Sequence, residues 1–160
     1  KVTIIKIGIK MDTQKSITLL NDLIVINNDR VEGYKTAEIE TPETELKILF
    51  YDMQATSESN RIELASAVTK LNGEVEEGTR ATGKFFRFWM DFKATITGNN
   101  RGTILDSCEY GEDKALEEYE NVLDEKEHLS IENLQMIQRQ KAQIEVDHTK
   151  VKKLRDEAMD

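Results

Sequence analysis

Four stretches of the chain repeat apolar residues at steps of three and four positions, and a long connection separates the second stretch from the third. This spacing is typical of amphipathic helices, which bury one stripe of side chains. The predicted helices span about residues 13–38, 43–71, 103–124 and 131–158. Because residues 74–102 lie between the second and third helices, those two cannot form a tight hairpin and are expected to run parallel. The sequence therefore predicts an all-α, antiparallel four-helix bundle with one long crossover.

The crossover is rich in aromatic residues. Gly73 is expected to end the second helix in a left-handed conformation. Half of the chain's aromatic residues then fall between Phe85 and Phe92, at a spacing that predicts a short helix from Lys84 to Thr97 with Trp89 largely buried. Two interpretations of this helix remain open. It packs across the open side of the bundle, or it forms an exposed apolar patch through which the protein makes a homo-oligomer.

Composition excludes several classes of function. The formal net charge of -9 argues against a nucleic-acid-binding protein and against attraction to anionic lipid surfaces. The chain has no apolar run long enough to cross a membrane. Its single cysteine, Cys108, cannot form an intramolecular disulfide, so we expect a reducing, cytoplasmic location.

The first ten residues differ from the rest of the chain. They alternate loosely between apolar and other residues and contain no acidic side chain. We expect residues 1–10 to form an extra N-terminal segment outside the bundle, and residues 11–160 to form the bundle itself. The segment is either an edge strand or partner-binding tail, or sequence upstream of a natural start at Met11. We favour the second interpretation, because the helical pattern begins directly after this methionine.

Three polar residues fall on the predicted inward faces of the last two long helices, namely Glu112, Glu145 and His148. Glu145 and His148 are three positions apart, so a helix points both side chains the same way. Burying a carboxylate without a partner costs several kcal/mol. We therefore expect these three side chains to converge in the interior, where they bind a metal or one another.

Three segments carry a resemblance to a known family. They are LNDLIVINNDRVEGY (residues 20–34), LNGEVEEGTRATGKFFRFWMDFKATITGNNR (71–101) and CEYGEDKALEEYENVL (108–123). Together with the helix that contains His148, they resemble a bacterial family of ferritin-like four-helix-bundle proteins of unassigned function, with rubrerythrin-like relatives. The resemblance implies the ferritin-like fold and implies no particular activity.

Di-iron proteins of the ferritin-like class use one Glu from each of two helices and a Glu-x-x-His pair from each of the other two. The resemblance places Glu145 and His148 at one such pair, and Glu112 at a glutamate position. On the second helix, however, Ser57 and Asn60 stand at the positions of glutamate and histidine. On the first helix, Asn27 replaces glutamate.

The resulting ligand set is incomplete. Two carboxylates and one imidazole suffice for at most one divalent ion of iron, manganese or zinc, so oxidation at a di-iron centre is not expected. The alternative is a non-enzymatic structural or interaction protein whose interior polar residues form a hydrogen-bond network. The shell of that network would consist of Asn27, Tyr34, Ser57, Asn60 and Tyr119. The residues alone leave both functions open.

Overall fold

The described part of the chain is entirely helical. The computed structural model describes the backbone of residues 2–78, 84–98 and 100–159, and within these ranges every side chain except those of residues 2–12, 84–87, 89 and 159. These residues contain no strand, which confirms the predicted all-α class. The α-helices are α1 (Val2–Glu40), α2 (Thr44–Lys70), α3 (Lys84–Gly98), α4 (Arg101–Leu123) and α5 (Ile131–Met159), and a short 3-10 helix, η1 (Lys126–His128), joins the last two.

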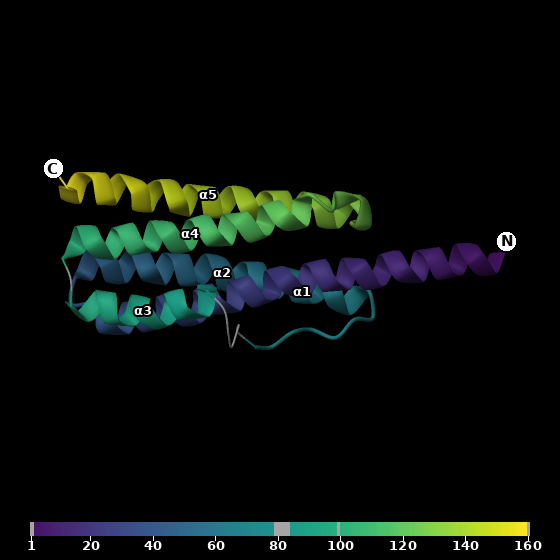
Figure 1. Ribbon diagram of the computed structural model, residues 1–160, viewed down its shortest axis with the longest axis horizontal. Coiled ribbons are helices and arrows are strands. Elements are labelled where there is room, and N and C mark those ends of the chain that lie inside the picture. The colour runs from purple at the N-terminus through teal and green to yellow at the C-terminus, as the bar shows by residue number, and fades with distance from the viewer. Residues whose placement is uncertain (1, 79–83, 99, 160) are drawn as a thin grey trace.

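Two pairs of long helices form the body of the molecule. Figure 1 shows α1 packed antiparallel to α2, and α4 packed antiparallel to α5, with the two pairs side by side. The helices α2 and α4 run in the same direction, as the long connection between them predicts. Within the described residues, every helix is too short or too polar to span a lipid bilayer.

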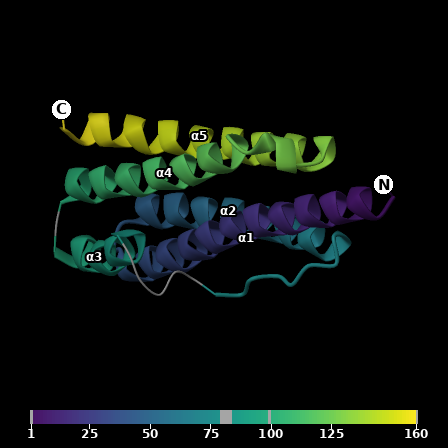
Figure 2. The same cartoon turned by 45° about the vertical axis from the view of Figure 1, so that its right-hand side comes forward.

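The helix α3 lies against α1 and α4 at one end of the molecule (Figures 1 and 2). Its side chains Phe92 and Ile96 are buried, and the Phe92 ring meets the rings of Tyr34 and Phe50 edge to face. This inward stripe covers the helices of its own chain. The side chain of Trp89 lies outside the described residues, so its expected burial stays a prediction.

The first helix begins at Val2 rather than near Thr13. The alternative of an edge strand is therefore wrong for residues 2–10, which are helical. The step of three positions from Ile4 to Ile7 interrupts the alternation, and a helix accommodates such a step. The N-terminal turns of α1 extend beyond the ends of α4 and α5 (Figures 1 and 2).

The end of α2 differs in detail from the prediction. The left-handed residue is Asn72, with a φ of 59°, and not Gly73. Gly73 is instead needed for close packing, because a Cβ atom there would lie 2.8 Å from the Ile17 side chain. The following segment is held by Asn21, whose side chain donates to the carbonyl of Glu74 and accepts from the amide of Glu76.

The core consists of two apolar clusters. One contains residues such as Leu20, Leu64 and Ile144, and the other is built around Tyr34 and Phe50. On each of the four long helices, buried polar residues fall between the positions that feed the two clusters. A polar layer therefore divides the core near the middle of the helices.

Candidate functional site

A completely buried arginine is the centre of the polar layer. Arg30 lies on the inward face of α1, three positions after Asn27 and four before Tyr34, so helical spacing points it into the interior. Its Nε and Nη2 atoms donate to the two carboxylate oxygens of Glu112 on α4, at 2.9 and 2.6 Å. This is a bidentate charge-assisted pair, which is the strongest geometry available to arginine.

Two further helices supply partners to the same guanidinium. Its Nη1 atom donates to the hydroxyl of Ser57 on α2 at 2.5 Å, and Nη2 lies 3.5 Å from a carboxylate oxygen of Asp147 on α5. Arg30 therefore connects all four long helices. The ring of Tyr34 lies beneath the guanidinium, 5.6 Å from its central carbon.

Burial raises the pKa of both acids that face Arg30. Burial raises the pKa of Glu112 above its ordinary value, and attraction to Arg30 offsets part of that rise. Burial also raises the pKa of Asp147, again with Arg30 acting in the opposite direction. Burial lowers the pKa of Arg30. Attraction to Glu112 and the other neighbours outweighs this effect and leaves the pKa of Arg30 above its ordinary value. A guanidinium held in this way stays protonated and cannot serve as a base.

A second network adjoins the arginine. The Asn27 amide donates to the Tyr119 hydroxyl at 2.8 Å, and that hydroxyl donates to Gln140 on α5 at 2.8 Å. Asn60 on α2 donates to the Asn27 side-chain oxygen at 3.3 Å, and Gln140 returns a hydrogen bond of 3.3 Å to the Asn60 carbonyl. The chain of bonds reaches the surface at Glu63, which accepts from Gln140. Each long helix again contributes at least one group.

The expected shell residues are all interior. The structure buries Asn27, Tyr34, Ser57, Asn60 and Tyr119. Three of them are joined by hydrogen bonds to one another, and Ser57 and Tyr34 contact Arg30. The arrangement is that of a connected hydrogen-bond network, in which each member limits the positions of the others.

The expected convergence of Glu112, Glu145 and His148 is wrong. Glu112 lies in the interior on Arg30, whereas the Glu145 side chain is 51% exposed and pairs with Lys141 at 2.9 Å on its own helix. The reason is the rotation of α5, whose inward positions are filled by Ile144 and Asp147. Glu145 and His148 each follow one of these positions, so both are turned about 100° away from the core.

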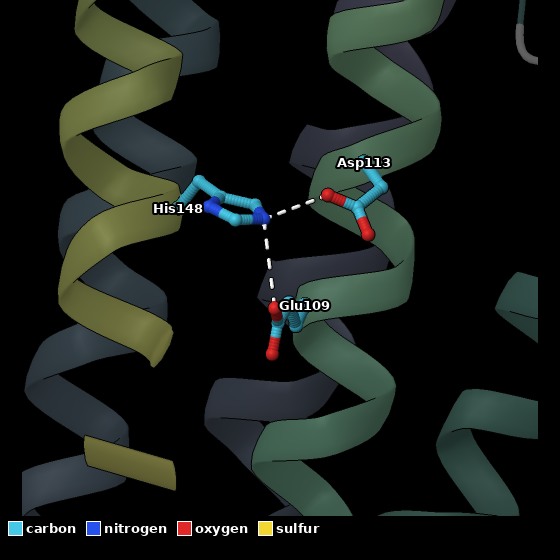
Figure 3. A group of neighbouring side chains, drawn as sticks. All are labelled: Glu109, Asp113 and His148. Carbon is cyan, nitrogen blue, oxygen red and sulfur yellow. Dashed lines mark ion pairs between the residues drawn. The ribbon is translucent and has the colours of Figure 1, made fainter. Parts of the chain in front are cut away.

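His148 instead faces two acids on α4, outside the buried layer (Figure 3). Its Nε2 atom lies 2.7 Å from a carboxylate oxygen of Asp113 and 3.8 Å from one of Glu109. The side chains of His148 and Glu109 are 21% and 16% exposed, and that of Asp113 is 60% exposed. Among the described residues, these three side chains form a group that could hold a metal ion.

We did not identify from the sequence three residues whose side chains pair with others inside the polar layer, namely Arg30, Gln140 and Asp147. Arg30 shares the apolar stripe of α1, and an inward Glu112 requires a positive partner. These two facts are the signal that points to Arg30, although they do not show that the two side chains meet. Gln140 and Asp147 follow the same spacing as Ile137 and Ile144 on α5, so the stripe itself contained the signal.

Cys108 offers no nucleophile. It is a free, completely buried thiol. Burial, with the neighbouring Glu112 charge adding to it, raises the pKa of the Cys108 thiol well above its ordinary value. A thiolate is the reactive form, so this cysteine is inert.

The comparisons with known proteins identify a family. They identify no relative with a recorded activity. No curated protein matches the chain significantly. Residues 15–125 match the model of a family described as "Domain of unknown function (DUF2383)", and this match covers the polar positions of α1, α2 and α4. Because the matched region is more than half of the chain, the protein belongs to the DUF2383 family.

Proposed function

We propose that this protein is a ferritin-like four-helix bundle in which a buried arginine occupies the place of the metal centre. Its function is structural and not enzymatic. The observation that carries the proposal is the bidentate pair between Arg30 and Glu112, both completely buried.

The order of the helices supports the ferritin-like architecture. Two antiparallel pairs, α1 with α2 and α4 with α5, are joined by a crossover that leaves α2 and α4 parallel (Figure 1). Ferritin-like bundles share this single long crossover. In those proteins the metal ligands project inward from the four helices near mid-length, which is where the polar layer of this chain lies.

The residues in the polar layer do not fit a dinuclear metal centre. The carboxylates nearest its middle are those of Glu112 and Asp147, and both already face the guanidinium of Arg30. Apart from Asp29 on α1, the other buried polar groups of the layer are hydroxyls and amides, which carry no charge to offset two divalent ions. A metal ion placed among them would also be repelled by Arg30.

A connected polar layer has a clear structural use. Arg30 contacts groups on the three other long helices. Sliding any helix by one turn would therefore leave a buried charge without a partner. The layer thus fixes the register of the bundle. The buried Cys108 thiol suits the reducing, cytoplasmic location expected from the sequence.

The test compares Glu112→Gln with the parent protein in urea, with and without added Fe²⁺, Mn²⁺ or Zn²⁺. If Glu112 serves only Arg30, the variant loses about 3–5 kcal/mol of unfolding free energy, the typical cost of breaking a buried ion pair, regardless of metal. Glu117→Gln is the matched control on α4, because Glu117 forms an exposed pair with Lys114. A metal-dependent gain in the parent that disappears in Glu112→Gln would overturn the proposal.

A further inference from the structure

The neighbouring helices α4 and α5 carry a group of ligand-type side chains that the structural role does not use. Glu109 and Asp113 are four positions apart on α4 and therefore project from the same face. His148 reaches them from α5 (Figure 3). We propose that Glu109, Asp113 and His148 form a site for one divalent transition-metal ion of the Zn²⁺ type.

The geometry matches that of a single ion. One ligand atom from each residue lies within 4.8 Å of the other two, and His148 Nε2 lies 2.7 and 3.8 Å from the two carboxylate oxygens. Nitrogen and oxygen ligands bind Zn²⁺ at about 2.0–2.2 Å, which places neighbouring ligands roughly 3–4 Å apart. Small rotations of the side chains are enough to centre an ion between them.

The His148 Nε2 atom supplies independent support. It is enclosed by protein and faces both carboxylates, with an Asp113 oxygen 2.7 Å away in an ion pair that is not a well-aligned hydrogen bond. A nitrogen aimed at two carboxylates in this way can bind a metal ion between them.

Arg155 orients the carboxylate of Glu109. Its guanidinium pairs with Oε2 of Glu109, which leaves Oε1 directed at His148. A partner of this kind orients a ligating carboxylate, as outer-shell groups do in known metal sites. Arg155 also draws charge away from Glu109, so we expect modest affinity.

The donor set selects the class of ion. Mg²⁺ and Ca²⁺ prefer ligand sets made only of oxygen, whereas an imidazole with carboxylates suits Zn²⁺ and its neighbours in the transition series. The three protein ligands leave the remaining coordination position to water. Because two ligands lie on α4 and one on α5, a bound ion would link the two helices and stabilise their pairing.

The experiment is a calorimetric titration of the full-length protein, prepared without a polyhistidine tag, with ZnCl₂. We expect one ion per chain in the parent and an affinity at least about tenfold weaker in His148→Ala. His128→Ala is the matched control: the other histidine of the chain lies in η1 beside Glu127, outside the group. Its affinity should equal that of the parent.

Two further measurements test the same site, namely the Zn²⁺ affinity of the carboxylate variants and the melting temperature with Zn²⁺. Glu109→Gln and Asp113→Asn should each weaken binding, and Zn²⁺ should raise the melting temperature of the parent and of His128→Ala but not of His148→Ala. If His148→Ala folds poorly, His148→Gln replaces it. Equal affinity in the parent and the His148 variant, or no binding up to about 1 mM Zn²⁺, would overturn the proposal. Binding that persists in Glu112→Gln separates this site from the polar layer.

Discussion

Arg30 and Glu112 face each other across the interior, and two hydrogen bonds of 2.9 and 2.6 Å join the guanidinium to both oxygens of the carboxylate. Both side chains are completely shielded from solvent. They belong to α1 and α4, which come from different helix pairs. Removing one partner alone should destabilise the protein more than replacing both, because it leaves the other partner as an unpaired buried charge.

Arg30→Met should therefore destabilise the protein strongly. Methionine retains much of the volume but leaves Glu112 and Asp147 without their cation, and breaking a buried pair typically costs about 3–5 kcal/mol of unfolding free energy. Urea denaturation measures the loss. The double variant Arg30→Met/Glu112→Met should recover much of it, because apolar side chains need no charged partner.

The control for this prediction is Arg139→Met. Arg139 pairs with Glu63 at 2.7 Å at the surface, where such pairs contribute about 0–1 kcal/mol. If the double variant is no more stable than Arg30→Met, this explanation is contradicted, because the loss of unfolding free energy would then come from packing and not from an unpaired buried charge.

Tyr119→Phe should also destabilise, through lost hydrogen bonds. The Tyr119 hydroxyl accepts from Asn27 and donates to Gln140, and both partners are buried. Removing it leaves the Gln140 oxygen without this donor, at a cost of about 1–3 kcal/mol. Tyr110→Phe on the same helix is the control. Tyr110 is 47% exposed, so the urea midpoint of this variant should equal that of the parent. Equal midpoints for Tyr119→Phe and the parent would contradict the network.

The helices and most inward faces of this fold could be predicted from the sequence. Apolar residues at three- and four-residue steps require no knowledge of the partner helix, and inward positions such as Asn27, Asn60 and Glu112 followed from the same steps. Ser130 precedes α5 and caps it, by accepting from the Asn133 backbone amide at 3.1 Å. These features depend on local spacing alone.

The residues that make up the polar layer could not all be predicted from helical spacing. Glu145 and Asp147 are both acids near the middle of α5, and only the packing of α5 against the other helices decides which one turns inward. Arginine is usually found at the surface, so Arg30 drew no attention although its spacing was correct. Its partner Glu112 is 82 positions away, a pairing that helical periodicity does not reveal.

Gly111→Ala should weaken the packing of α3 on α4. A Cβ atom at Gly111 would lie 2.7 Å from the ring of Phe88, which leaves no room for it. Overpacking of this kind costs about 1–3 kcal/mol. Gly98→Ala is the matched control, because a Cβ atom there meets nothing within 4 Å. The added variant Phe88→Leu should restore stability to Gly111→Ala, and a lack of rescue would place the strain elsewhere.

The buried acid Asp147 and the surface acid Glu63 should give opposite dependences of stability on pH. Burial raises the pKa of Asp147 above its ordinary value of 3.8, against the smaller opposing effect of Arg30. The folded state therefore holds this proton more tightly than the unfolded state, and the contribution of Asp147 to unfolding free energy falls as pH rises above that value. The hydrogen bond from Arg139 lowers the pKa of Glu63 below 4.5, so its stabilising contribution is present above 4.5 and is lost as pH falls through the folded pKa.

Urea unfolding of the parent, Asp147→Asn and Glu63→Gln between about pH 3 and about pH 7 separates the two effects. Each amide variant removes one titration and keeps the other groups, so the difference in unfolding free energy from the parent isolates that residue. As pH rises, the parent should lose stability relative to Asp147→Asn and gain stability relative to Glu63→Gln. If both differences rise with pH, attraction to Arg30 outweighs the burial of Asp147, and Asp147 is a full ionic partner of the arginine at neutral pH.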